Sequence, residues 1–256
     1  MKRSIFFVLL GLSLAFLVSC SKNNPTEPSG QEAQQVLSNA SGQPIPTVAD
    51  NVFGVLATIN FELQSIPGIP AVGIAMGFAQ FGDGLDAGTV SVNAKELGKT
   101  TQTGKTIYIT PSPSNPTQSL DGLSFDGSEH KWNVSGGNGV SKFSTAVKSP
   151  KSFSVTAPTG NATVDKSKGI IVSWNNSSPG SKVLIALVSQ NNPEKLYISE
   201  NLDDNGSFTI PASKISGMSG QSLLEIVKFN YNLVDSGGKT YAVISEIVKT
   251  LTITLN

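Results

Sequence analysis

The chain has 256 residues with 18 basic and 18 acidic side chains, so its formal net charge is zero. Charged residues make up 14% of it, against about 25% in an average soluble domain. A single Cys and a single His exclude an intrachain disulfide and any zinc site built from a cluster of thiolates and imidazoles.

The first 19 residues have the pattern of a secretory signal peptide. Lys2 and Arg3 form a positive start, and residues 5–18 carry no charge. That stretch is shorter than the roughly 20 apolar residues that span a bilayer, which disfavours the alternative of an uncleaved anchor helix. Removal of residues 1–19 leaves 16 basic and 18 acidic side chains, a net charge of −2 and no Arg. Such a chain lacks the basic patch that nucleic acids require.

The segment ends in Leu17-Val18-Ser19-Cys20, which resembles the lipobox of bacterial lipoproteins. The resemblance implies cleavage between Ser19 and Cys20, a diacylglyceryl group on the Cys20 sulfur and acylation of the new amine. Several acyl chains anchor a protein stably where one chain is marginal. The implied location is the bacterial cell envelope, and Ser21 after the lipidated Cys favours the outer membrane. The periplasmic and the surface side of that membrane remain alternatives.

Residues 20–46 follow as a polar segment rich in Pro, Ser, Asn and Gln. This composition predicts a flexible tether rather than a packed element. A coil of this length holds the following domains roughly 25–30 Å from the lipid.

Residues 47–149 are predicted to form a β-rich domain of unassigned family. Apolar side chains alternate with small or polar ones over residues 55–63 and again over residues 72–79, which is the period of a strand. Further strands are expected between turns rich in Gly and Pro, at residues 89–93, 106–110, 120–125 and 130–135.

Residues 150–256 show a more regular pattern. Seven short strands separated by turns are typical of an immunoglobulin-like sandwich, and they are expected at residues 153–155, 170–174, 183–188, 196–199, 207–210, 223–231 and 241–253. Asn205-Gly206 is predicted to be a hairpin-type turn. A domain boundary near Ser149-Pro150 is one interpretation, and a bend inside one larger sandwich is the other.

Two motifs in this second half carry a resemblance. The run from Gly169 to Trp174, followed by a polar turn and residues 182–185, is similar to the B and C strands of fibronectin type III-like domains, which often hold a buried Trp at the end of strand B. Residues 205–211 resemble the E-strand region of bacterial immunoglobulin-like modules. The resemblance implies that Trp174 belongs to the core.

Three Gly-Lys-Thr triplets begin at Gly98, Gly104 and Gly238. None has a Gly at the earlier position that a phosphate loop requires, and strands flank them all. We therefore interpret them as turn residues and expect no nucleotide.

His130 is expected on the same strand face as Trp132 and Val134, and no nucleophile motif points to it. This pattern favours a half-buried strand histidine over a general base or metal ligand.

Acidic residues gather at three places, and Asp-rich loops can supply the oxygens that calcium needs. The best group for calcium is Asp121, Asp126 and Glu129, although none of the three places has the spacing of a calcium loop. Turns stabilised by Asp and Asn side chains are the favoured interpretation. We accordingly expect neither a bound metal nor a cofactor.

The sequence thus predicts an all-β protein with two immunoglobulin-like or related β-sandwich domains after a flexible tether. The favoured function is a lipid-anchored, non-catalytic envelope protein that acts as an interaction, adhesion or structural module. It contacts the membrane through lipid on Cys20 and meets a protein or glycan partner. A glycan- or peptide-binding module is the first alternative, and a hydrolase that uses only carboxylates is the second. Fold analogy alone does not decide between them.

The lipobox generates the first testable prediction. Cys20→Ala removes the sulfur that the lipid requires, so the protein should leave the membrane fraction or persist as an unprocessed precursor. Cell fractionation and the intact mass of the purified protein measure both effects. Unchanged fractionation together with an unchanged mass would contradict the lipoprotein interpretation.

Overall fold

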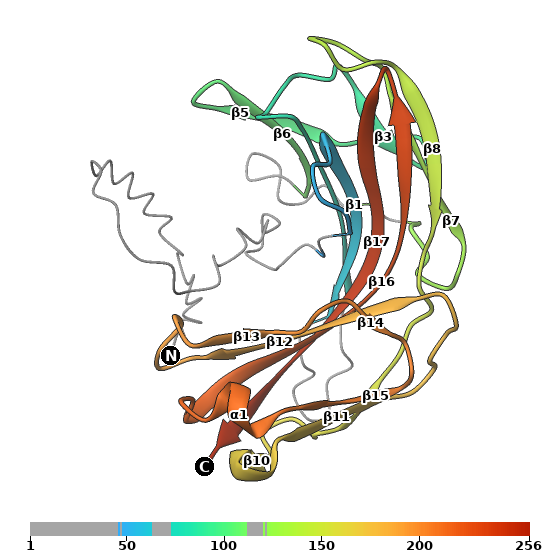
Figure 1. The fold of residues 1–256 in the computed structure, drawn as a ribbon. Helices are drawn as coiled ribbons and strands as arrows, with labels where there is room; N and C mark the ends of the chain where they lie inside the picture. The colour runs from blue at the N-terminus through green and yellow to red at the C-terminus, as the bar shows by residue number, and fades with distance from the viewer. Residues whose placement is uncertain (1–45, 47, 63–72, 112–119, 121) are drawn as a thin grey trace, which may run out of the picture. The chain divides into compact units, whose positions relative to one another are not determined.

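The structure is a computed structural model that describes residues 46, 48–62, 73–111, 120 and 122–256. The predicted signal peptide, the lipobox and nearly all of the predicted tether lie outside these residues. All described residues belong to one unit of the chain. Strands dominate this unit, which confirms the all-β prediction (Figure 1).

Eight strands precede Ser149: β1 (Gly54–Glu62), β2 (Gly73–Phe81), β3 (Val90–Val92), β4 (Lys95–Glu96), β5 (Gly98–Gln102), β6 (Lys105–Thr110), β7 (Glu129–Val134) and β8 (Phe143–Lys148). Three of them, β4, β5 and β8, were not predicted. Conversely, the strand predicted at residues 120–125 is wrong for the described part of that range. There Gly122 has a φ of 88° and the Leu123 N–H bonds to the Leu120 carbonyl, which forms a turn.

Nine strands and two short helical turns follow: β9 (Val155–Ala157), β10 (Thr163–Val164), a 3-10 turn (Lys166–Lys168), β11 (Ile170–Trp174), β12 (Lys182–Ser189), β13 (Leu196–Ile198), β14 (Leu202–Asp203), β15 (Ser207–Ile210), α1 (Ala212–Ile215), β16 (Gly220–Ser236) and β17 (Lys239–Leu255). The predicted bounds of β11 and β15 match the observed ones. The last two strands are longer than predicted, at 17 residues each.

Ten strands form one continuous sheet in which β16 and β17 are central. Its main path runs β13-β12-β16-β17-β1-β2-β6-β5, with β10 and β14 pairing at its margins. β1 pairs with β17 in parallel over nine residue pairs, although about 180 residues separate the two strands. This pairing joins the first half of the chain to the second.

A four-stranded sheet, in the order β4-β3-β7-β8, packs on one end of the ten-stranded sheet. We call this pair of layers the N-terminal sandwich. Its core has Trp132 and Val134 from β7 against Leu56, Phe81 and Tyr241 from the larger sheet. Tyr241 and Trp132 are each at most 1% exposed.

A three-stranded sheet, in the order β15-β11-β9, packs on the other end, and we call this pair the C-terminal sandwich. Ser149-Pro150 lies where the chain passes from β8 of the first facing sheet toward β9 of the second. Asn205-Gly206 connects β14 of the large sheet to β15 of the small one. The prediction of a hairpin there is therefore wrong, since its two strands belong to different sheets.

The two sandwiches share β16 and β17. The large sheet therefore continues from one sandwich into the other, although a domain boundary was predicted between residues 149 and 150. Along β17 the side chains that face these layers belong first to one core and then to the other, with Val243 in the first and Ile247 in the second. The described structure is thus one sheet with two partial coverings.

Trp174 anchors the C-terminal sandwich through a buried polar cluster, which confirms its predicted place in the core. It is 4% exposed, and its Nε1–H donates to Asp204 Oδ1 at 2.6 Å. The same carboxylate pairs with Lys228 Nζ at 2.9 Å, and both of these charged side chains are fully buried. A buried charge pair of this kind needs every partner in place, because loss of one leaves the other charge desolvated.

Substitution of this tryptophan tests the arrangement. Trp174→Ala should lower the free energy of unfolding by about 3–5 kcal/mol, the range for a buried large aromatic side chain. Ile171→Ala on the same strand is the matched control, because Ile171 is 63% exposed and such surface changes stay within about 0.5 kcal/mol. Urea denaturation of the two variants measures both values. Equal stability of the two would refute the placement of Trp174.

Candidate functional site

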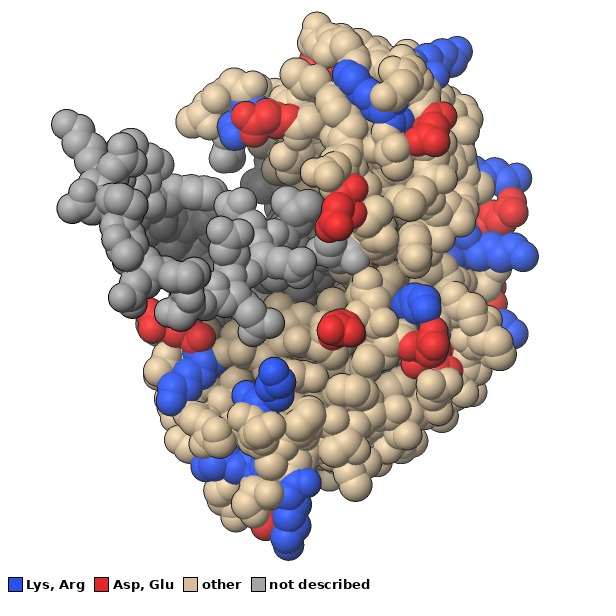
Figure 2. All heavy atoms as spheres, in the orientation of Figure 1, with Lys and Arg blue, Asp and Glu red and all other residues tan. Residues whose placement is uncertain are grey.

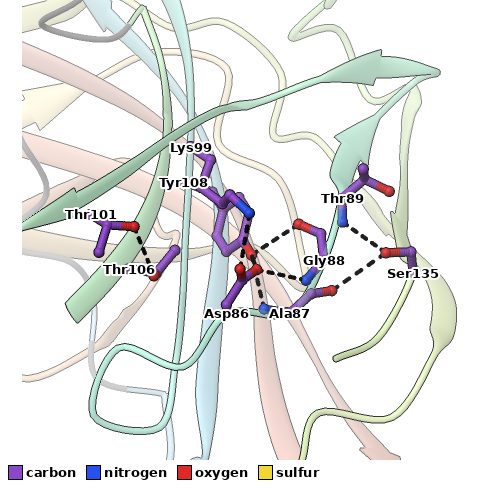
Figure 3. Close-up of polar contacts among 9 residues, drawn as sticks. All are labelled: Asp86, Ala87, Gly88, Thr89, Lys99, Thr101, Thr106, Tyr108 and Ser135. Carbon is purple, nitrogen blue, oxygen red and sulfur yellow. Dashed lines mark hydrogen bonds and ion pairs between the residues drawn. The ribbon is translucent and has the colours of Figure 1, made fainter. Parts of the chain in front are cut away.

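Two of the three Gly-Lys-Thr lysines pair with the acidic loop between β2 and β3. Lys99 Nζ lies 2.9 Å from Asp86 Oδ2, and Lys105 Nζ lies 2.5 Å from Asp83 Oδ1 (Figure 3 shows the first pair). Both pairs are substantially exposed, so each contributes little to stability. These contacts make the two lysines part of local ion pairs and give them no role toward a phosphate.

The third lysine, Lys239, donates to the Gly139 carbonyl at 2.6 Å and lies 3.8 Å from the ring centroid of Phe53. It therefore stabilises the hairpin end of β17. The prediction that all three triplets are turn residues is wrong for Gly98-Lys99-Thr100, which lies within β5. The other two begin at glycines of positive φ in hairpin turns.

Asp86 also belongs to a partly buried hydrogen-bond cluster around Tyr108 (Figure 3). The Tyr108 hydroxyl lies 2.8 Å from Asp86 Oδ1 and 3.0 Å from the Gly88 carbonyl, and it accepts a hydrogen bond from the Ala87 N–H. Burial, followed by the bond to Asp86, raises the pKa of Tyr108. The cluster fastens the loop before β3 to β6, so its role is to hold two layers together.

The predicted calcium group is only partly described, because Asp121 lies outside the described residues. Asp126 Oδ1 accepts a hydrogen bond from the Ser128 N–H at 2.9 Å, which is the side-chain-stabilised turn that the sequence favoured. Hydrogen bonds from Ser128 hold the pKa of Asp126 below its usual value. No group of three metal-ligating side chains occurs among the described residues. Glu129 begins β7 and is exposed.

His130 is fully buried rather than half-buried, and it lies on the same face as Trp132 and Val134, as the alternation predicted. Its Nδ1 lies 2.7 Å from Thr58 Oγ1, and its Nε2 lies 3.2 Å from the Ser124 carbonyl. A carbonyl only accepts, so Nε2 carries the proton and Nδ1 accepts from the threonine. Burial lowers the pKa of this imidazole. His130 is thus a neutral link between β7 and β1, closed off from solvent.

Two buried glutamates, which the sequence analysis did not single out, lie on the other face of the ten-stranded sheet. On β17, Glu246 lies on the same face as Ile244 and Val248, which belong to an apolar cluster. On β16, Glu225 lies on the same face as Val227 of that cluster. Both are at most 3% exposed. Both oxygens of Glu246 and one of Glu225 have no hydrogen-bond partner among the described residues.

Desolvation raises the pKa of Glu225 to about 7 and that of Glu246 to about 8. The proximity of the two carboxyls raises the value for Glu246 further. Near neutral pH, Glu246 therefore remains largely protonated and Glu225 is about half protonated. They affect stability, and with no open access to solvent they do not form a reactive pair.

The best candidate for a binding site is a groove of about 620 Å³ where the two sandwiches meet. We call it the junction groove. Its walls come from the start of β7, the end of β8, the turn at residues 178–181 and the middle of β16. Both sandwiches thus contribute to one open cleft.

Side chains from β16 fix the two walls relative to each other. Asn230 Nδ2 donates to the Lys148 carbonyl at 3.0 Å, and Asn232 Nδ2 donates to the Ala146 carbonyl at 2.6 Å. On the β8 side of the groove, the Gly127 N–H donates to the buried Ser149 hydroxyl at 3.0 Å. These bonds make the groove a preformed feature, as most small-ligand sites are.

The groove offers varied hydrogen-bonding groups and one aromatic ring. The residues that line it include Lys148, Lys151, Glu129 and Tyr231, and Tyr231 is 36% exposed. Glu129 and Lys148 are directly opposite each other across β7 and β8. The described lining holds neither His nor Cys. This combination suits the binding of a polar chain.

Elsewhere the described surface is sparsely charged. On the face shown in Figure 2, lysines and acidic residues of the described part are scattered, and several lie side by side as opposite charges. That face has no stripe of basic side chains. This agrees with a ligand that is not a polyanion.

Sequence reasoning identified Glu129, although for calcium, and missed the rest of the groove. Asn230 was predicted only as part of a strand, and Lys148 belongs to a strand that was not predicted. Their common site arises because β8 and β16 come together from positions more than 80 residues apart. No local pattern reports such a contact.

Comparison with known proteins adds little to this geometry. No family model matches the chain, and no curated protein matches it. Among solved structures, the chain is similar to one described as "Biofilm associated protein - BSP domain", at 16% identity and a TM-score of 0.19. The likeness covers 68% of this chain and 26% of that one, so this chain spans about a quarter of its length. The functional argument therefore rests on the groove.

The two buried glutamates predict how stability depends on pH. Their pKa values are raised from 4.5 to about 7 and about 8 in the folded protein, so folding favours their protonated form. The contribution of these two glutamates to stability should be greatest below pH 4.5, fall as the pH rises, and level off above pH 8. Glu246→Gln should remove much of this fall, which we expect to be about 2–5 kcal/mol in total.

Urea denaturation between pH 4.5 and pH 9 measures this effect. Glu129→Gln is the matched control, because this exposed glutamate should leave the profile unchanged. A Glu246→Gln profile parallel to that of the natural chain would show that the carboxyl of Glu246 is not held protonated by folding.

Proposed function

We propose that this protein is a lipid-anchored, non-catalytic interaction module of the bacterial cell envelope. It binds a partner chain, a glycan or a peptide, in the junction groove. The observation that carries the proposal is this preformed cleft, whose walls come from both sandwiches and are joined by the amides of Asn230 and Asn232.

The lining of the groove supports binding over hydrolysis. Glycoside hydrolysis by carboxylates needs two of them on either side of the scissile bond. Glu129 is the one carboxylate in the described lining. Glu225 and Glu246, the other close pair of acids described above, are buried beneath the opposite face of the sheet.

The N-terminal pattern supports the location. Lipid on Cys20 would anchor the chain, and a tether over residues 20–46 would carry the sandwiches clear of the membrane surface. Among the described residues, no helix has the length and apolar character of a membrane span.

The proposal is tested with the full chain, extracted in mild detergent and applied to arrays of glycans and of peptides. A ligand of the groove should bind at least tenfold more weakly to Tyr231→Ala and to Lys148→Glu, because both side chains line the cleft. Lys168→Glu is the matched control, since Lys168 is an exposed lysine on the 3-10 turn and does not line the groove.

Three results would contradict the proposal. One is that no glycan and no peptide binds. Another is binding that both groove variants leave unchanged. The third is release of cleaved products from the array, which would show that the chain is a hydrolase.

A further inference from the structure

We propose that residues 230–236 of β16 bind an extended peptide as an additional strand, antiparallel to β16 and in line with β12. The inference rests on the proposed function, because it names the ligand of the junction groove. It follows from an edge of the ten-stranded sheet that the described chain leaves without a neighbour.

This open edge begins where β12 begins. Lys182 of β12 pairs with Phe229 of β16, and before Lys182 the chain turns away at residues 178–181. From Asn230 to Ser236, β16 continues for seven residues, and no described strand pairs with its outer side. An added strand would occupy the place that β12 would take if it extended further.

The hairpin turn decides which backbone groups face this edge. Ser236 pairs with Lys239 across the two-residue turn Gly237-Gly238, and such a closing pair exchanges both of its hydrogen bonds. Alternate residues from Ser236 therefore bond to β17. The residues between them, Tyr231, Leu233 and Asp235, direct their N–H and C=O groups outward.

The edge lacks the protection that exposed edges usually carry. Proteins discourage strand addition with Lys, Pro or bulges, and residues 230–236 contain neither Lys nor Pro. By contrast, the edge strand β5 carries Lys99. The edge of β8 is covered where the carbonyls of Ala146 and Lys148 accept from β16 side chains.

The edge also exposes apolar side chains. Tyr231 is 36% exposed and Leu233 is 47% exposed, and the two lie on one face of the strand. The Tyr231 ring stacks toward Phe229, with ring centroids 6.2 Å apart. An incoming strand would cover these side chains and satisfy the backbone at the same time, which is the usual basis of recognition by strand addition.

The flanking walls favour a single chain over a second copy of the protein. The open edge begins in a groove of about 620 Å³, which residues 230–232 line together with the end of β8 and the turn at residues 178–181. One extended strand fits in such a cleft. The same edge of a second copy would bring its own β8 and its own turn into the same space.

The walls also indicate the chemistry of the peptide. Successive side chains of a strand point to opposite faces. Every second side chain of the ligand would therefore pack beside Tyr231 and Leu233 and should be apolar. The side chains between them would lie toward Lys148 and Lys151 and should be polar or acidic.

The test uses a displayed library of random nonapeptides and the full chain in detergent. We expect enrichment of peptides that alternate apolar with polar or acidic residues. Leu233→Pro should weaken the best peptide at least tenfold, because proline removes an outward N–H while leaving the β16–β17 ladder intact. Thr101→Pro, at an outward position of the edge strand β5, is the matched control and should bind as the natural chain does.

Amide hydrogen exchange gives a second readout that does not depend on a variant. Bound peptide should slow exchange at Tyr231, Leu233 and Asp235 and leave the amides of β5 unchanged. Far-ultraviolet circular dichroism of the two proline variants checks that both remain folded.

Each other outcome overturns the inference in a distinguishable way. A peptide or glycan that binds Leu233→Pro undiminished, yet loses affinity in Lys148→Glu, leaves the proposed function standing and removes strand addition. A concentration-dependent dimer of the natural chain that Leu233→Pro abolishes would assign the edge to a second copy. Failure of every peptide and glycan to bind would remove both proposals.

Discussion

The fold depends on one uninterrupted hairpin, in which β16 and β17 pair over 17 consecutive positions. Such a length is about three times that of an ordinary strand. Because side chains alternate, each strand presents one row to the two facing sheets and the other row to the opposite face. A slip of one residue would exchange both rows, so the two cores together enforce a single register.

The side chains in the middle of this hairpin are polar. They lie between the core of the N-terminal sandwich and the core of the C-terminal sandwich. On the row that faces the two sheets, Ser245 of β17 contacts His130, and Lys228 of β16 pairs with Asp204. On the other row, Glu246 lies among aliphatic side chains. Polar groups at these positions prevent the two apolar cores from merging into one. The junction groove lies beside the same stretch. The polar residues that separate the two cores are therefore next to the candidate binding site.

The sequence predicted strands well where apolar alternation was clean, as in β11 and β15. It ended β16 at residue 231, because Asn232 follows Asn230 at an inward position that alternation reserves for apolar residues. Their amides instead bond to β8, which itself holds only Phe143 and Val147 as buried apolar residues and was missed. The parallel pairing of β1 with β17 had no local signal at all, since register between distant strands depends on shape and not on composition.

The parallel pairing of β1 with β17 also has a mechanical consequence. In a parallel pair, tension between the start of one strand and the end of the other acts along the strands, so the nine residue pairs from Gly54 to Glu62 share the load. Two strands loaded in this way slide past each other only when all of these bonds yield together, whereas strands pulled apart from one end open one bond at a time. Pulling between Gly54 and Leu255 therefore loads the strongest direction of the sheet.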